Sequence, residues 1–112
     1  MGRPGIKICG IKDSAALGAA LSAGADHIGL VFVAASPRHI GLEAGAALAR
    51  EARGRARVVG LFVDPDLAEL EAAQRAVGLD VIQLHGRESA PFAATVRSAL
   101  GREPWKAIGV RT

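Results

Sequence analysis

The sequence predicts an α/β protein in which the strands of a parallel sheet alternate with helices. Strand-like apolar runs and alanine-rich helix-like runs alternate strictly along the 112 residues, which gives five strands and four helices. The pattern Gly-x-Asp-x-Ile-x-Leu occurs at 24–30 and again at 78–84, each time between a helix-like run and a strand-like run. The repeat indicates that similar βα units recur along the chain.

Five short segments are predicted as strands, because they are apolar, contain β-branched residues and lie between turn residues. They are residues 5–11, 26–33, 56–64, 80–86 and 104–110. The second segment, "DHIGLVFV", is an almost continuous apolar run, which is typical of a strand covered on both faces.

Four segments are predicted as helices: residues 13–24, 42–53, 65–78 and 88–101. Asp13 or Ser14 can cap the first helix, and Gly24 follows it where a left-handed residue is favoured. Pro65 and Pro91 are each expected in the first turn of a helix, where a residue without an N–H is tolerated.

The composition suits one domain over residues 1–112, with a core of Ala, Val, Leu and Ile. The formal charge is +3, and the basic residues are scattered apart from 50–57, which argues against nucleic-acid binding and allows an anionic small molecule. A single cysteine cannot form an internal disulfide, and no apolar run is long enough to span a membrane. We therefore expect a cytoplasmic protein whose partner is neither a membrane nor a nucleic acid.

Two architectures are built from this alternation, an open doubly wound sheet and a closed (β/α)8 barrel. The length favours the open sheet, because a barrel normally needs about 250 residues. An open nucleotide-binding sheet usually carries a glycine-rich turn after its first strand, whereas "CGIKDS" has one glycine there. If the fold is a barrel, the chain holds four βα units and a fifth strand, and its end at Thr112 fits a fragment.

Polar side chains occupy one face of two predicted strands, toward their C-terminal ends. Alternation places Lys7 with Cys9 on one face of the first strand, and Val81, Gln83 and His85 on one face of the fourth. A helix-covered open sheet has little use for such groups, whereas the inward face of a barrel ends at the mouth where active sites lie. This pattern favours the barrel, while the length favours the open sheet.

Two of these polar residues and two loop residues are candidates for chemistry. Cys9 can act as a general base or nucleophile if its thiol is ionised, and Lys7 and the helix start that follows would both favour the thiolate. The alternative is that Cys9 only packs, as a lone cysteine more often does. Arg38, in the loop "SPRH", can grip a carboxylate or phosphate, or be an ordinary exposed arginine. His85 can be an acid, base or ligand, or a structural histidine, and Asp64 can reach the mouth or cap the next helix.

Together the motifs resemble the phosphoribosylanthranilate isomerase family of tryptophan biosynthesis. The matching stretches, in the family's order and spacing, are "KICGI" (7–11), "AGADHIGLVF" (23–32), "SPR" (36–38), "VGLFVD" (59–64), "GLDVIQLHG" (78–86) and "KAIGV" (106–110). The family is a (β/α)8 TIM barrel, so the resemblance implies a half-barrel of four βα units plus a fifth strand, truncated at the C-terminus. It also implies an enzyme, an intramolecular oxidoreductase that needs no cofactor and no metal.

The family's reaction is the Amadori rearrangement of N-(5-phosphoribosyl)anthranilate to 1-(2-carboxyphenylamino)-1-deoxyribulose 5-phosphate. By resemblance, Cys9 is the general base, Arg38 holds the anthranilate carboxylate, and Gln83 and His85 line the mouth beside the sugar. The family's general acid, an aspartate on the sixth strand, and its phosphate-binding loops after strands seven and eight have no counterpart in the sequence.

Two expectations follow for the 112-residue chain on its own. Without the acid and the phosphate-binding loops it should be inactive or nearly so. Its two open sheet edges should make it unstable or cause self-association. The alternative function is a non-catalytic open α/β module that binds a ligand or partner at its strand ends, and this alternative requires no missing half.

Overall fold

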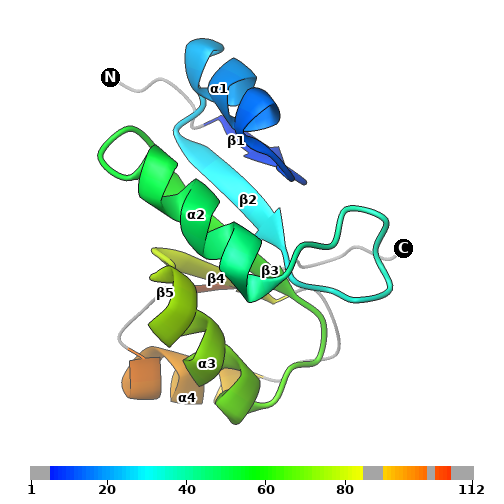
Figure 1. Cartoon of the computed structure of the whole chain (residues 1–112). Helices are drawn as coiled ribbons and strands as arrows, with labels where there is room; N and C mark the ends of the chain where they lie inside the picture. The colour runs from blue at the N-terminus through cyan, green and yellow to red at the C-terminus, as the bar shows by residue number, and fades with distance from the viewer. Residues whose placement is uncertain (1–5, 85–89, 101–102, 107–112) are drawn as a thin grey trace, which may run out of the picture.

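The computed structural model of the protein describes residues 6–84, 90–100 and 103–106. Five strands and four helices alternate along these residues, as the sequence predicts (Figure 1). Their bounds are β1 Lys7–Cys9, α1 Ser14–Ser22, β2 His27–Val31, α2 Leu42–Ala52, β3 Arg57–Phe62, α3 Leu67–Val77, β4 Val81–Leu84, α4 Ala90–Leu100 and β5 Glu103–Lys106.

The strands form one parallel sheet in the order β1-β2-β3-β4-β5. A doubly wound sheet reverses its strand order at a switch point and carries helices on both faces. Here each strand lies beside the next one in the sequence, and α1 packs beside α2, α2 beside α3 and α3 beside α4 (Figure 1). The helices form one layer over one face of the sheet, as in part of a (β/α)8 barrel, so the predicted fold class is confirmed.

The main core lies between the helices and the face of the sheet that they cover. Alternate residues of β2, β3 and β4 point into this core and are fully or almost fully buried. They are Ile28, Leu30, Val58, Phe62, Ile82 and Leu84. Leu48 of α2 and Leu70 of α3 pack against them. Because each such side chain contributes about 1.5–3 kcal/mol on burial, this layer is the main source of stability.

The opposite face of the sheet, which we call the concave face, carries different side chains. Val31 and Val81 are buried but do not belong to the helix-side core. Lys7, Cys9 and Gln83 are half-buried on the same face. The prediction that each of these strands turns its polar residues to the face opposite the helices is therefore correct.

A hydrogen bond across the concave face shows how strongly the sheet curves. The Lys7 ammonium of β1 donates to the side-chain oxygen of Gln83 in β4, although β2 and β3 lie between these strands. In a flat sheet, three strand spacings would separate them by about 14 Å. Lys7 is level with His27 in the ladder, whereas Gln83 is level with Leu61, further along the strands. The contact therefore requires the curl and strand tilt of a barrel wall.

The repeated Gly-x-Asp turns make the same two hydrogen bonds in both copies. Asp26 Oδ2 accepts from Ile6 N at 2.9 Å, and Asp26 N donates to Ile6 O at 2.8 Å. Asp80 Oδ2 accepts from Val58 N at 2.8 Å, and Asp80 N donates to Val58 O at 2.9 Å. In each copy, the turn before one strand is fastened to the start of the preceding strand. The predicted sequence repeat is thus a repeat of structure.

The ends of α1 agree with the sequence signals. The Asp13 side chain accepts from Ala16 N at 2.8 Å and caps the helix, while Gly24 follows its end with φ +90°. Pro91 is the second residue of α4, as predicted. None of the helices in the described part of the chain is long and apolar enough to cross a membrane.

The start of α3 differs from the prediction. Pro65 was expected in the first helical turn, but it precedes the helix. The N-cap is Asp66, whose side chain accepts from Glu69 N at 2.8 Å. Because a carboxylate can satisfy an N–H of the first turn and proline cannot, the helix begins after Asp66. Asp66, and not Asp64, therefore caps α3. Asp64 lies in the turn before the helix and has φ +47°.

Candidate functional site

Cys9, the last residue of β1, lies half-buried on the concave face. It pairs with Gly29 of β2, and a Cβ atom at Gly29 would lie 2.8 Å from the Cys9 Sγ. The thiol therefore occupies the space that a side chain at position 29 would fill. Gly10 N and Ile11 N both donate to Gly29 O, at 3.0 and 3.2 Å, which turns the chain away directly after the cysteine. Cys9 thus lies at the C-terminal end of its strand, as predicted.

Arg38 lies beside the residue that follows Cys9. Gly10 has φ +86°, and a Cβ atom built there would lie 2.6 Å from Arg38 Cδ and 3.3 Å from Arg38 Nε. The exposed arginine side chain therefore crosses the bare backbone of Gly10. A glycine is required there for two reasons, the left-handed φ and the close approach of this side chain. The structure brings Cys9 and Arg38 to one end of the sheet.

Three hydrogen bonds hold the loop of Arg38 in place. Arg38 N donates to Ser36 Oγ at 3.0 Å, and Lys12 Nζ donates to the Pro37 carbonyl oxygen at 3.2 Å. Beyond the arginine, Ile40 N donates to the carbonyl oxygen of Val31, the last residue of β2, at 3.0 Å. The "SPR" segment is therefore tied both to β2 and to the turn after β1.

Gln83 lies half-buried on the concave face of β4, where its side-chain oxygen accepts from the Lys7 ammonium. This bond uses the Gln83 side-chain oxygen and does not involve its amide N–H groups. Lys7 lies two residues before Cys9 on the same face, so β1 and β4 together place an ammonium, an amide and a thiol on this face. His85 lies outside the described residues, and its place at the mouth stays a prediction.

Three contacts of this site were not foreseen from the sequence: Lys7 with Gln83, Cys9 with Gly29, and Arg38 with Gly10. The Lys7–Gln83 bond depends on the curvature of the whole sheet, which no local pattern reports. The contact of Cys9 with Gly29 had a signal, because a glycine within an apolar strand often marks a close approach by another group. The sequence predicts only an effect of Lys7 on the thiol, and the structure adds its contact with Gln83.

The arrangement suits proton transfer on a small anionic molecule. A thiolate can remove a proton from carbon, and a guanidinium can bind a carboxylate or phosphate through two parallel hydrogen bonds. The two cations, Lys7 and Arg38, favour a negatively charged substrate beside Cys9. Within residues 6–84, 90–100 and 103–106, no group of three or more His, Cys, Asp or Glu side chains is placed to hold a metal ion.

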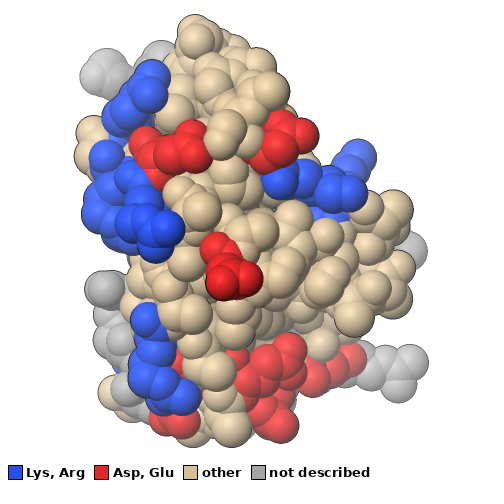
Figure 2. Space-filling view, in the orientation of Figure 1, with Lys and Arg blue, Asp and Glu red and all other residues tan. Residues whose placement is uncertain are grey.

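A basic surface lies at the other end of the sheet, around the turn between α2 and β3. Figure 2 shows Lys and Arg side chains gathered there, on the left of the view. A pocket of about 470 Å³ at the strand starts is lined by Arg53, Arg55 and Arg57 together with Asp26 and Asp80. Both carboxylates are bound to the backbone N–H groups described above. Cys9 is the last residue of its strand, whereas the residues that line this pocket precede or begin theirs. The basic surface is therefore separate from the site around Cys9, Arg38 and Gln83, which we call the thiol site.

Comparison with known proteins gives a consistent family. The model of the N-(5'-phosphoribosyl)anthranilate (PRA) isomerase family matches residues 6–110. N-(5'-phosphoribosyl)anthranilate isomerase of Rhodospirillum centenum is 51% identical over 105 residues, which cover 94% of this chain and 49% of the relative. The enzyme of the same name from Rhodopseudomonas palustris is 49% identical, with 96% and 49% covered. The chain spans about half the length of the curated relatives it matches.

Solved structures agree with the sequence comparisons. Phosphoribosyl anthranilate isomerase from Thermotoga maritima superimposes with a TM-score of 0.90 at 29% identity, covering 96% of this chain and 52% of that structure. A phosphoribosyl anthranilate isomerase in complex with reduced 1-(o-carboxyphenylamino)-1-deoxyribulose 5-phosphate also gives a TM-score of 0.90 at 29% identity, with 98% and 56% covered. The curved parallel sheet, the thiol at the end of its first strand and these matches lead to one conclusion: the chain belongs to the phosphoribosylanthranilate isomerase family.

Proposed function

We propose that this chain carries the general-base part of a phosphoribosylanthranilate isomerase active site, with a phosphoribosylated anthranilate as substrate. Residues 1–112 then form a single partial barrel domain of a cytoplasmic enzyme. The observation that carries the proposal is the position of Cys9, at the mouth end of β1 with Arg38 crossing the next residue. Membership of the family supplies the reaction.

The proposed reaction is an Amadori rearrangement in three stages. A general acid protonates the ring oxygen of the ribose, the bond from C1 to that oxygen breaks, and C1 and the amine nitrogen form an iminium. The Cys9 thiolate then removes the proton from C2, and the electron pair forms a C1–C2 double bond while the iminium nitrogen becomes a neutral amine. The enolamine finally tautomerises, because C1 gains a proton and the C2 hydroxyl becomes a ketone.

The described residues divide the binding work between the two ends of the substrate. Arg38 is exposed at the rim and is free to present its guanidinium fork to the anthranilate carboxylate. Gln83 faces the sugar with its amide N–H groups, because its oxygen is held by Lys7. By resemblance to the family, we also assign His85 to the sugar end of the substrate. A proton on C2 is made acidic by the neighbouring iminium, so the thiolate needs no metal to remove it.

The test is a joined barrel, in which residues 1–112 are fused to the second half of the Rhodospirillum centenum relative. The fusion should convert phosphoribosylanthranilate and restore growth without tryptophan in a strain that lacks the isomerase. Cys9→Ala should lower kcat by roughly 10²–10⁴-fold, the range for loss of a general base, with little change in KM. A folded fusion that has no activity, or that is unaffected by Cys9→Ala, would favour the non-catalytic α/β module.

Arg38→Lys tests the binding role in the same fusion. A lysine keeps the charge but not the two-pronged geometry, so KM should rise by about tenfold while kcat changes less. Arg97→Lys, on α4, is the matched control and should leave both constants unchanged, because Arg97 is an exposed helix residue away from the strand ends. Equal effects of the two substitutions would contradict the assignment.

A further inference from the structure

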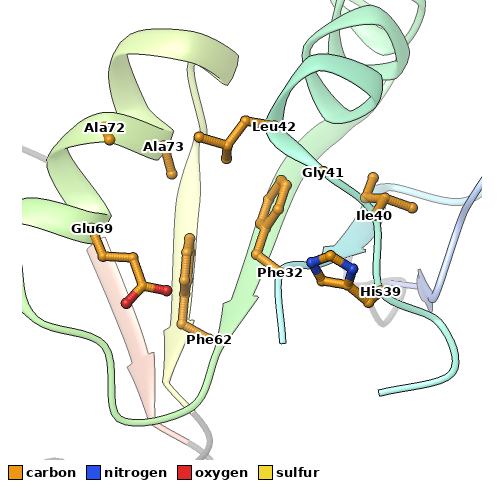
Figure 3. Close-up of a pocket in the computed structure, with 9 residues that line it drawn as sticks. All are labelled: Phe32, His39, Ile40, Gly41, Leu42, Phe62, Glu69, Ala72 and Ala73. Carbon is orange, nitrogen blue, oxygen red and sulfur yellow. The ribbon is translucent and has the colours of Figure 1, made fainter. Parts of the chain in front are cut away.

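A second pocket lies on the helix side of the sheet, apart from the thiol site. Its volume is about 240 Å³, and it lies between α3 and the segment that leads into α2 (Figure 3). The residues that line it are Phe32, His39, Ile40, Gly41, Leu42, Phe62, Glu69, Ala72 and Ala73. Cys9, Arg38 and Gln83 are not among them, so the pocket is not part of the proposed isomerase site.

Two aromatic rings form a fixed floor for this pocket. Phe32 and Phe62 are stacked, with ring centroids 5.4 Å apart and an interplanar angle of 26°. Phe62 is 1% exposed and Phe32 is 9% exposed, so neighbouring residues hold both rings from the other sides. A Cβ atom at Gly45 of α2 would lie 2.9 Å from the Phe32 ring, which shows how closely that ring is packed. The pocket is therefore preformed.

The pocket has an apolar interior and a carboxylate on its wall. In Figure 3 the Glu69 side chain extends from α3 toward the ring of Phe62. The Glu69 backbone N–H is bound by Asp66, but within the described chain its carboxylate has no hydrogen-bond or ion-pair partner. A carboxylate beside aromatic faces favours an organic cation, which gains from both the charge and the rings. Alanines 72 and 73 leave the space beside Glu69 open.

We propose that this pocket binds a small organic amine, in its protonated form, that carries one aromatic or branched apolar group. The apolar group would lie on Phe32 and Phe62, and the ammonium would pair with Glu69. The size is suitable, because a cavity of about 150 Å³ is enough for benzene and the larger volume accommodates a ring with a short aminoalkyl chain. The proposal does not depend on isomerase activity.

Occupation of the pocket would also affect the loop of the thiol site. His39 and Ile40 line the pocket, and Arg38 precedes them directly in the chain. Ile40 N is bound to Val31 O, so this segment is held between β2 and the pocket. An amine in the pocket would contact residues next to the one that we assign to substrate binding.

The experiment uses the joined barrel, labelled with ¹⁵N and titrated with phenethylamine. Saturable shifts should appear at the backbone amides of 39–42 and 69–73. The anion 3-phenylpropionate has the same ring and a similar length, and it should bind at least about tenfold more weakly, since a charge-assisted pair contributes roughly that factor. Shifts confined to other residues, or equal binding of the two probes, would overturn the proposal.

Two pairs of variants assign the site. Glu69→Gln should weaken phenethylamine binding by about tenfold, whereas Glu71→Gln, on the same helix but outside the pocket, should not change it. Ala72→Phe should fill the pocket and abolish binding, and Ala76→Phe, at an exposed position of α3, should have no effect. Unchanged affinity in both Glu69→Gln and Ala72→Phe would show that the amine binds elsewhere.

Discussion

At the scale of single residues, the thiol site depends as much on missing side chains as on present ones. Gly29 leaves room for the Cys9 sulfur, and Gly10 leaves room for the Arg38 side chain. Neither glycine takes part in the proposed chemistry. Each one leaves room for a side chain to which we assign a role in that chemistry. The two glycines therefore leave the space that the Cys9 thiol and the Arg38 side chain occupy.

Gly29→Ala should displace Cys9, because the added Cβ would occupy the space of its side chain. The added Cβ would lie 2.8 Å from the Cys9 Sγ and 3.1 Å from the Cys9 Cα, and because the second contact is with backbone, a strand must shift. We expect the joined barrel to lose about 1–3 kcal/mol in urea unfolding and to show a lower kcat. Gly18→Ala is the control, since nothing lies within 4 Å of that added Cβ on α1 and a helical alanine should stabilise. A variant at Gly29 with wild-type stability and kcat would contradict this account.

The sequence identified individual site residues better than it identified their contacts. Cys9, Arg38 and Gln83 were found from strand alternation and from motifs, because both are local in the chain. The contact of Arg38 with Gly10 joins residues in two different loops and depends on how each loop folds back. Such contacts depend on three-dimensional packing, which the sequence pattern of one segment does not contain.

At the scale of elements, the repeated turn explains how successive βα units are fastened together. Asp26 and Asp80 do the same work in the two copies, but their surroundings differ. The hydrogen bond from Val58 N to Asp80 is partly buried, whereas the one from Ile6 N to Asp26 is exposed. Water can replace the exposed bond more easily than the buried one.

Asp80→Ala should therefore destabilise the joined barrel more than Asp26→Ala. We expect a loss of about 1–3 kcal/mol for Asp80→Ala, because Val58 N is left without its acceptor in a partly buried place, and about 0.5–1.5 kcal/mol for Asp26→Ala. Urea unfolding of the two variants measures the difference. The reverse order would mean that burial does not decide the strength of these bonds.

The type and order of every helix and strand were predictable, but not all of their ends. Periodicity and glycine positions identify an element, and Asp13 and Gly24 also located the ends of α1. For α3 two adjacent signals competed, a proline suited to the first turn and an aspartate suited to the cap. The aspartate defines the start, because its carboxylate satisfies an N–H group of the helix.

At the scale of the whole molecule, the sequential strand order and the single helix layer decide for a barrel over a doubly wound sheet. The length alone favoured the open sheet, whereas the polar concave face favoured the barrel. The Lys7–Gln83 hydrogen bond supports the barrel by joining strands that are not neighbours. Curvature is a property of the whole sheet, which is why the sequence could suggest it but not establish it.

Lys7 and Gln83 should be energetically coupled. Lys7→Met leaves the half-buried Gln83 oxygen without its donor, so we expect a loss of about 1–3 kcal/mol in the joined barrel. The double variant Lys7→Met/Gln83→Leu should lose less than the sum of the two single variants, with a coupling of about 0.5–1.5 kcal/mol. Additive effects in urea unfolding would show that the bond across the sheet contributes nothing to stability.

The 112-residue chain should behave differently from the joined barrel in solution. Within the described sheet β1 and β5 are the edge strands, and unpaired edges pair with other chains. Sedimentation velocity should show association of the chain that grows with concentration and weakens in the fusion. We also expect no measurable turnover by the chain alone. A monodisperse, cooperatively unfolding monomer would contradict the first expectation, and turnover would contradict the second.

The sequential strand order has a consequence for synthesis on the ribosome. Each strand pairs only with its neighbours in the chain, so every βα unit can dock on the previous one as soon as it emerges. The bond between Lys7 and Gln83 joins residues 76 positions apart and must wait for β4. A nascent chain would therefore first assemble as a ribbon of paired strands and acquire its full curvature late, once the fourth strand has been translated.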